Sequence, residues 1–200
     1  MYWSIILPME MLVAVGLGVG LASVAGVRAF LPLALAALFT IFGLFEFPAQ
    51  VFGVDGWIPA AVFGVLALLE IALDKIRALQ RVFNIVAVPI RAVSGAVLFA
   101  AALGLEIEMD SMPWLVVGAV IASLVAVLKV VLRPSSRTPS TGVSPSFLSA
   151  FEDVVALVGG AIGLFVPYLP ALLVAFLLFF FNRIKKRRGR KFGGLRILGD

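Results

Sequence analysis

Seven charged residues stand inside long apolar stretches of this sequence. The stretch "GVRAFLP" at 26–32 shows the pattern, because Arg28 is the only charge between Glu10 and Glu46. Charges in apolar helices are costly, so they face the interior of a helix bundle, pair with one another and mark ion or substrate pathways. We therefore expect a buried charge cluster or transport site. Its members are Arg28, Glu70, Asp74, Arg91, Lys129, Glu152 and Asp153.

The spacing of these charges predicts particular pairs. Counting about 1.5 Å per residue along helices places the acidic pair 152–153 near the depth of the two arginines. Guanidinium groups engage carboxylates bidentately, so we expect the pair 152–153 to contact Arg28 or Arg91. Glu70 and Asp74 lie one helical turn apart, and a cation should therefore sit between them.

Two interpretations of the cluster stay open. In one, it lines a water-accessible vestibule that binds an ion, a proton or an anionic headgroup. In the other, the ion pairs lock the helices together and bind nothing. For Lys75 and Lys129, close to predicted helix ends, we favour side chains that extend to the membrane surface.

Composition excludes several kinds of chemistry. The chain has no cysteine and no histidine, so it lacks thiolate nucleophiles, the usual general base and the commonest metal ligand. It also has no HExxH sequence, and we find no paired-aspartate protease motif. We assign no catalytic residue, metal or cofactor and disfavour an enzyme, although a phospholipid-modifying activity of Asp or Glu alone stays open.

The elements that position the charges are membrane helices. Hydrophobic residues make up 62% of the 200-residue chain and charged residues only 14%, an excess too large to bury in a soluble domain of this size. We expect an all-α, polytopic helix bundle with six to seven spans, comprising a single domain over 1–182 and a basic tail over 183–200. The predicted helices are 11–26, 29–46, 57–74, 83–105, 113–132, 147–165 and 168–184.

The apolar stretch between Glu10 and Glu46 must be interrupted. As one helix it would measure about 52 Å, against a hydrocarbon core of roughly 30 Å. Gly26, Arg28 and Pro32 favour a break. Residues 11–25 then form either a short span or one arm of a re-entrant hairpin.

The connections between helices alternate in charge. Acidic or uncharged connections, at 46–55, 106–110 and 165–170, contain no Lys or Arg. Basic segments stay in the cytoplasm, so the C-terminus should be cytoplasmic and the N-terminus outside. The predicted interface residues are Lys75, Arg77, Arg81, Arg133, Lys185, Lys186, Arg187 and Arg188.

A weak internal repeat runs through the chain. Residues 64–75 align without gaps to 118–129, and the same shift maps Pro59 onto Pro113. The pattern predicts three helical hairpins plus an N-terminal segment; chance similarity among Ala/Val/Leu-rich helices is the alternative. The small-residue stretch "GLGVG" at 16–20 predicts close helix packing, as do the glycines at 159–163.

Five segments in order carry a resemblance to a known family: "AGVRAFLPLALAAL", "LLEIALDK", "VPIRAVSGAVLFAAA", the pair Lys129 and Arg133, and "SPSFLSAFEDVVAL". They resemble an uncharacterised bacterial membrane family, domain of unknown function 4126, over roughly 11–182. Departures from its pattern are Val27 for Leu, Pro89 before rather than after Arg91, and Leu132 for Thr. The resemblance implies a bacterial inner-membrane protein whose motif residues fall on the charge cluster, but it implies no activity.

Two functions fit these observations. The first is a small transporter, channel or lipid-handling protein that uses the charge cluster as a site near the cytoplasmic side. The alternative is a non-catalytic scaffold or assembly factor that binds other membrane proteins. The expected partners are the bilayer, anionic lipid at the C-terminal tail and a possible second copy of the chain; we expect no nucleic acid.

Overall fold

The computed structural model of the protein describes residues 3–45, 56–76, 80–105, 109–133 and 144–193. These residues form seven α-helices and a short 3-10 helix, with no strand among them. The helices are α1 (Trp3–Val27), α2 (Phe30–Ile41), α3 (Ile58–Lys75), α4 (Gln80–Ala102), α5 (Met112–Leu132), α6 (Pro145–Gly163) and α7 (Leu169–Gly193); the 3-10 helix η2 (Met109–Ser111) precedes α5.

The predicted break between the first two helices is present, but their relative lengths differ from expectation. α1 has 25 residues and begins before Glu10, which lies exposed on it and does not end it. The description of 11–25 as a short segment was therefore wrong. The short helix is α2, which has 12 residues and ends at Ile41 instead of 46. α7 also continues past the predicted boundary at 182/183, so basic residues predicted to form a tail are helical.

Glycines explain where α2 and α4 end. Gly43 has φ +66° and Gly104 has φ +64°, a left-handed conformation that residues with a side chain rarely adopt. At the end of α2, the Gly43 and Leu44 amides donate to carbonyls of the last helical turn. Gly104 and Leu105 repeat this arrangement after α4. Both ends are Schellman motifs, which stop a helix before its apolar sequence is exhausted.

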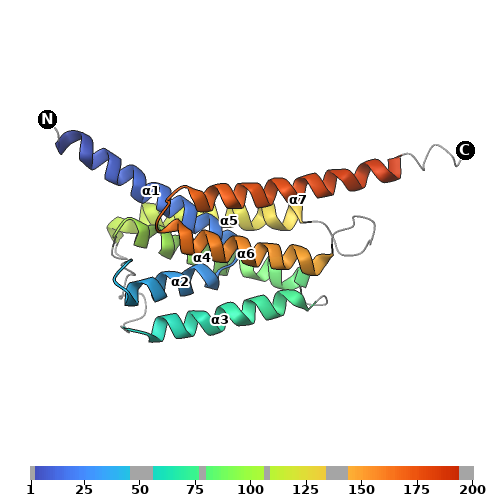
Figure 1. Cartoon of the computed structure of the whole chain (residues 1–200), viewed down its shortest axis with the longest axis horizontal. Coiled ribbons are helices and arrows are strands. Elements are labelled where there is room, and N and C mark those ends of the chain that lie inside the picture. Colours follow the sequence, from blue (N-terminus) through green and yellow to red (C-terminus); the bar gives the residue numbers. More distant parts are fainter. Residues whose placement is uncertain (1–2, 46–55, 77–79, 106–108, 134–143, 194–200) are drawn as a thin grey trace, which may run out of the picture.

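α1 is the central helix of the bundle. It packs against α2, α4, α5, α6 and α7, and its residues from Leu21 to Val27 are buried. Figure 1 shows the chain reversing direction after α1, with α2 lying next to α3 and with α3 and α6 extending past the turn between α1 and α2. α3 lies at the edge of the bundle and packs mainly on α2. The break at Arg28 is thus surrounded by other helices.

Glycines allow close packing within the bundle, as the sequence predicts for 16–20 and 159–163. A Cβ atom on Gly20 would lie 2.7 Å from the Pro167 carbonyl oxygen, and one on Gly159 would lie 2.9 Å from a Val24 methyl carbon. The closest backbone approach joins α4 to α5. There a Cβ on Gly118 would lie 2.5 Å from the Gly95 carbonyl oxygen, and one on Gly95 would lie 2.8 Å from the Gly118 carbonyl oxygen. These helices can approach so closely only because both contact positions are glycine.

We expect Gly95→Leu to lower the free energy of unfolding by about 2 kcal/mol, because the added side chain has no space between α4 and α5. Reversible unfolding in mixed detergent micelles measures this value. Gly64→Leu is the matched control, since nothing lies within 4 Å of a Cβ at Gly64. Equal losses of stability in the two variants would contradict the packing described here.

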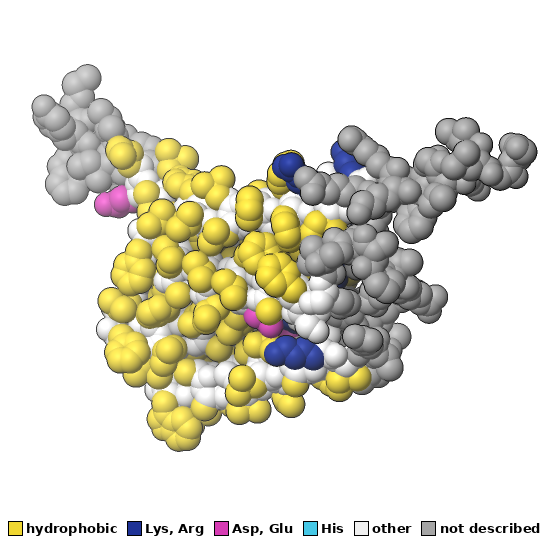
Figure 2. Space-filling view, turned by 45° about the vertical axis from the view of Figure 1, so that its right-hand side comes forward, with side chains coloured by type: hydrophobic (Ala, Val, Ile, Leu, Met, Phe, Trp, Pro, Cys, Tyr) yellow, Lys and Arg dark blue, Asp and Glu magenta, His cyan; other side chains and the backbone are white. Residues whose placement is uncertain are grey.

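The outer surface of the bundle is apolar. Large hydrophobic side chains are exposed along α3, α4, α5, α6 and α7, among them Leu68, Val93, Val120, Leu157 and Phe176. Figure 2 shows hydrophobic side chains covering much of one face. Within the described residues, four segments are long and apolar enough to cross a membrane: Met9–Val27, Ile85–Ala102, Met109–Leu132 and Ser146–Gly163. This surface and these lengths define an integral membrane protein.

Candidate functional site

The break between α1 and α2 leaves backbone groups without helical partners, and neighbouring helices supply them. Glu70 of α3 accepts hydrogen bonds from the first free amides: Oε1 lies 3.2 Å from the Ala29 nitrogen and Oε2 lies 3.2 Å from the Phe30 nitrogen. The carboxylate therefore caps the N-terminus of α2. A negative charge at this position is stabilised by the partial positive charge of the helix end.

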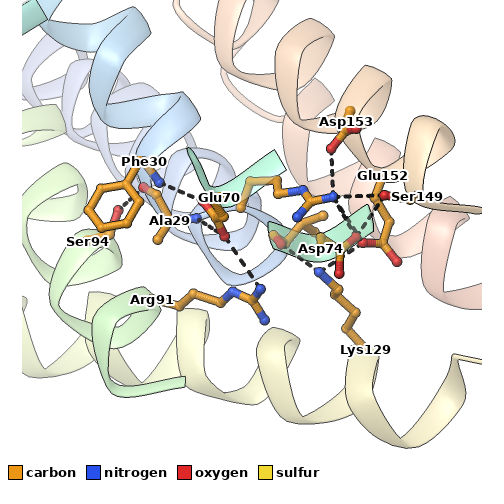
Figure 3. A network of polar contacts seen from close by, with 12 residues as sticks. Ala29, Phe30, Glu70, Asp74, Arg91, Ser94, Lys129, Ser149, Glu152 and Asp153 are labelled. Carbon is orange, nitrogen blue, oxygen red and sulfur yellow. Dashed lines mark hydrogen bonds and ion pairs between the residues drawn. The ribbon is translucent and has the colours of Figure 1, made fainter. Parts of the chain in front are cut away.

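Two carbonyl groups at the break accept hydrogen bonds, one from a cation and one from a hydroxyl group. Lys129 Nζ of α5 donates to the Val27 carbonyl oxygen at 2.8 Å, at the C-terminal end of α1. Ser94 Oγ of α4 donates to the Ala29 carbonyl oxygen at 2.6 Å. Each broken helix end thus faces the charge that complements its dipole. Figure 3 shows Glu70 and Lys129 approaching the break from different helices.

Arg28 itself extends between α3 and α6. Its Nη2 atom lies 2.9 Å from Asp74 Oδ2, 2.7 Å from Asp153 Oδ1 and 3.8 Å from Glu152 Oε2. Ser149 Oγ lies 3.3 Å from the same nitrogen and donates to Asp74 Oδ2 at 2.7 Å. One guanidinium nitrogen therefore meets three carboxylates (Figure 3).

The other cations complete the charge balance. Lys129 Nζ lies 2.9 Å from Glu152 Oε2. Arg133 Nη1, just after α5, lies 3.2 Å from Asp74 Oδ1 and 3.3 Å from Glu152 Oε1. Arg91 Nη2 of α4 lies 3.5 Å from Glu70 Oε1.

We call these eight side chains the polar layer. It contains four cations and four anions, so its formal charge is zero. Most of its side chains are at most 1% exposed, but that of Arg133 is 11% exposed and that of Asp153 is 18% exposed. The layer therefore reaches the surface at these two residues. Its members are Arg28, Glu70, Asp74, Arg91, Lys129, Arg133, Glu152 and Asp153.

The structure brings together all seven residues of the predicted cluster. The expected contact of Arg28 with the acidic pair at 152–153 is present, whereas Arg91 contacts Glu70 instead. The expectation that Lys129 extends to the membrane surface was wrong. Its side chain is 0% exposed because Val27 and Glu152 hold the ammonium group inside the bundle.

Arg133, predicted to be an interface residue, also belongs to the polar layer, because its side chain contacts Asp74 and Glu152. Its spacing of four residues from Lys129 places both on one helix face and was the available signal. Ser94 and Ser149 were missed, and no sequence pattern distinguishes them from other serines.

The other predicted interface residues have different outcomes. Lys75, Lys185 and Lys186 are exposed, and Lys185 Nζ donates to the Val131 carbonyl oxygen at 2.8 Å. Arg77 and the side chains of Arg81, Arg187 and Arg188 lie outside the described residues.

The polar layer retains hydrogen-bonding capacity. Among the described residues, Arg28 Nε and Nη1 have no hydrogen-bond partner. The two carboxylate oxygens of Glu152 lie within ion-pair distance of Lys129 and Arg133 but accept no hydrogen bond from any described residue. No group of three or more acidic residues among those described is arranged to hold a metal ion. Unfilled donors and acceptors together favour water or a hydrogen-bonding ligand in the layer.

Comparison with known proteins places this membrane protein in a family. Residues 15–187 match the family described as "Domain of unknown function (DUF4126)", and the chain belongs to it. The matched region includes the whole polar layer. No curated protein and no solved structure matches the chain.

Proposed function

We propose that this protein is a small membrane transporter that binds its substrate or coupling ion in the polar layer. The observation that carries the proposal is the discontinuous α1–α2 pair, whose two broken ends are held inside the bundle by Glu70 and Lys129. Transporters build substrate and ion sites at such breaks because helix ends supply charge at membrane depth. Irregular backbone is tolerated there only inside protein or beside a water-filled cavity.

The arrangement of charges supports an orientation for this transporter. α3, α5 and α7 end in basic residues at one end of the bundle, next to the polar layer. At their opposite ends lie Trp57, Trp114 and Tyr168, the aromatic types that gather at membrane interfaces. The basic end is therefore proposed to face the cytoplasm of a bacterial cell, across the inner membrane. The C-terminus lies there, in contact with anionic lipid, and the N-terminus lies outside.

The repeat also has support in the polar layer. Pro59, Pro113 and Pro170 are each the second residue of a helix, in α3, α5 and α7. The segments that precede these three helices all contribute to the polar layer. Arg28 lies just before α2, Arg91 lies in α4 and the acidic pair at 152–153 lies in α6. In this proposal α2–α3, α4–α5 and α6–α7 are three hairpins around α1. α2 alone, about 18 Å long, is shorter than the hydrocarbon core. It nevertheless returns the chain from the break to the outer side, so that the N-terminus lies outside and the C-terminus lies in the cytoplasm.

Flux through reconstituted protein tests the proposal. The protein would be placed in liposomes of phosphatidylethanolamine and phosphatidylglycerol that contain a pH-sensitive dye. Two fluxes would be measured: proton movement driven by a sulfate gradient, and movement of fluorescent phosphatidylglycerol between leaflets. We expect wild type to exceed protein-free liposomes in at least one flux, Arg28→Gln to abolish it, and exposed Asp110→Asn to retain it.

The scaffold function is the alternative, and the zero net charge of the polar layer favours it. A neutral network can lock helices together without a ligand. Folded wild-type protein with no more flux than protein-free liposomes in both assays would reject the transporter. Loss of stability in Arg28→Gln without any flux in wild type would then support the scaffold. The mass of the protein in detergent would show whether the scaffold self-associates.

A further inference from the structure

We propose that the polar layer couples a proton to an oxyanion: Asp153 takes up the proton, and Arg28, released from Asp153, binds the oxyanion. The oxyanion is a phosphate ester, a carboxylate or a related group. This inference rests on the proposed transporter function and names the substrate class of the same site.

Asp153 is the carboxylate of the layer that is easiest to neutralise. Its side chain is 18% exposed, whereas those of Glu70, Asp74 and Glu152 are at most 1% exposed. Among the described residues, Arg28 is the one cation within ion-pair distance of Asp153. A proton can therefore reach Asp153 from outside the layer, and only one ion pair is lost when it binds.

The surroundings of Asp153 also favour its neutralisation. Asp74 of α3 and the adjacent Glu152 share Arg28 Nη2 with Asp153, and like charges so close disfavour full ionisation. The cations of α5, Lys129 and Arg133, are held by the other two carboxylates. α7 contributes uncharged aromatic rings to the region around Asp153, because its Phe176 and Phe180 pack on Phe151 of α6.

Arg28 has donors ready for an oxyanion. Its side chain is 0% exposed, and Nε and Nη1 have no hydrogen-bond partner among the described residues. Its contacts with carboxylates all pass through Nη2. A guanidinium presents its donors as a planar fork that matches carboxylate and phosphate oxygens. The unused edge of Arg28 is therefore chemically suited to an oxyanion.

Charge balance links the two events. With four cations and four anions the layer is formally neutral, and an entering oxyanion would leave it negative. A proton that binds a carboxylate oxygen of Asp153 raises the formal charge to +1, and a monovalent oxyanion returns it to zero. Release of the oxyanion and the proton restores the ion pair between Arg28 and Asp153. No bond other than the O–H bond of Asp153 forms or breaks.

Sulfate binding to the full-length protein in detergent tests this coupling by isothermal titration. Sulfate keeps its charge between about pH 5.5 and about pH 8, so pH acts on the protein alone. We expect wild type to bind sulfate about tenfold more tightly at the lower pH, as one added buried charge implies. Asp153→Asn, which mimics the protonated carboxyl, should bind at pH 8 as wild type does at pH 5.5. Asp110→Asn should behave as wild type.

Three controls keep the test decisive. Arg28→Gln combined with Asp153→Asn should not bind sulfate, and binding by this double variant would overturn the proposal. Weak binding by Asp153→Asn at both pH values would overturn it as well. Dihexanoyl phosphatidylglycerol, with dihexanoyl phosphatidylcholine as its control, distinguishes a lipid headgroup from a free anion as the source of the oxyanion.

Failure of this coupling is distinguishable from failure of the proposed function. Sulfate binding with the expected pH dependence but no flux in liposomes keeps the proton–oxyanion site and rejects the transporter. Flux that Arg28→Gln abolishes, together with sulfate binding that Asp153→Asn leaves unchanged, keeps the transporter and rejects the coupling.

Discussion

Replacement of Arg28 by leucine is expected to lower the free energy of unfolding by about 3–5 kcal/mol, the usual cost of removing one partner from a buried ion pair. Arg28 Nη2 lies within 3 Å of both Asp74 and Asp153. Without the guanidinium, the polar layer has three cations for four carboxylates, and its net charge of −1 lies inside a membrane bundle. Leucine fills part of the space but cannot compensate this charge.

The measurement is reversible unfolding in mixed micelles of detergent and dodecyl sulfate. Lys75→Leu is the matched control because Lys75 is exposed at the end of α3, and surface ion pairs contribute little. We expect it to change stability by less than about 1 kcal/mol. Similar effects of the two variants would show that Arg28 is solvated instead of buried among carboxylates.

Lys129→Met is expected to cost about 3 kcal/mol, because it leaves the Val27 carbonyl and Glu152 without their ammonium partner. Glu152→Gln should also destabilise, since Lys129 and Arg133 lose the carboxylate that they share. The double variant should cost less than the sum of the two, with a coupling energy of about 2 kcal/mol. The four unfolding free energies form a double-mutant cycle.

The control for this cycle pairs Lys129→Met with Asp110→Asn. Asp110 is exposed in η2 at the opposite end of α5. The effects of these two changes should add, because distant sites without shared partners are independent. Additivity between Lys129→Met and Glu152→Gln would instead contradict the ion pair at 2.9 Å.

Local signals made most of the fold predictable. The length of the stretch between Glu10 and Glu46, with Gly26, Arg28 and Pro32 inside it, was sufficient to place the break. The predicted positions of helix ends were less accurate where the backbone conformation determines the end. The Schellman motif at Gly43 stops α2 before its apolar sequence ends, and the helix of α7 continues into a basic sequence because Lys and Arg are good helix formers.

The membership of the site was predictable from charge, but its contacts were not. Lys75 and Lys129 occupy equivalent places near helix ends in the sequence, yet one is exposed and the other is buried. The difference is the Val27 carbonyl, which the broken helix presents to α5 and not to the end of α3. Which carboxylate each arginine contacts depends on how the helices pack, and no local sequence pattern encodes that packing.

Accessibility of position 153 tests most directly whether the polar layer is a site open to the cytoplasm. Because the chain has no cysteine, Asp153→Cys can be labelled alone with a membrane-impermeant thiol reagent in intact cells and in inverted vesicles. Val154→Cys is the control, since that side chain is exposed on the apolar surface of α6. We predict that Asp153→Cys reacts only from the cytoplasmic side and that Val154→Cys reacts from neither. An Asp153→Cys variant that is unreactive from both sides, or reactive from outside, would contradict a cytoplasm-facing site.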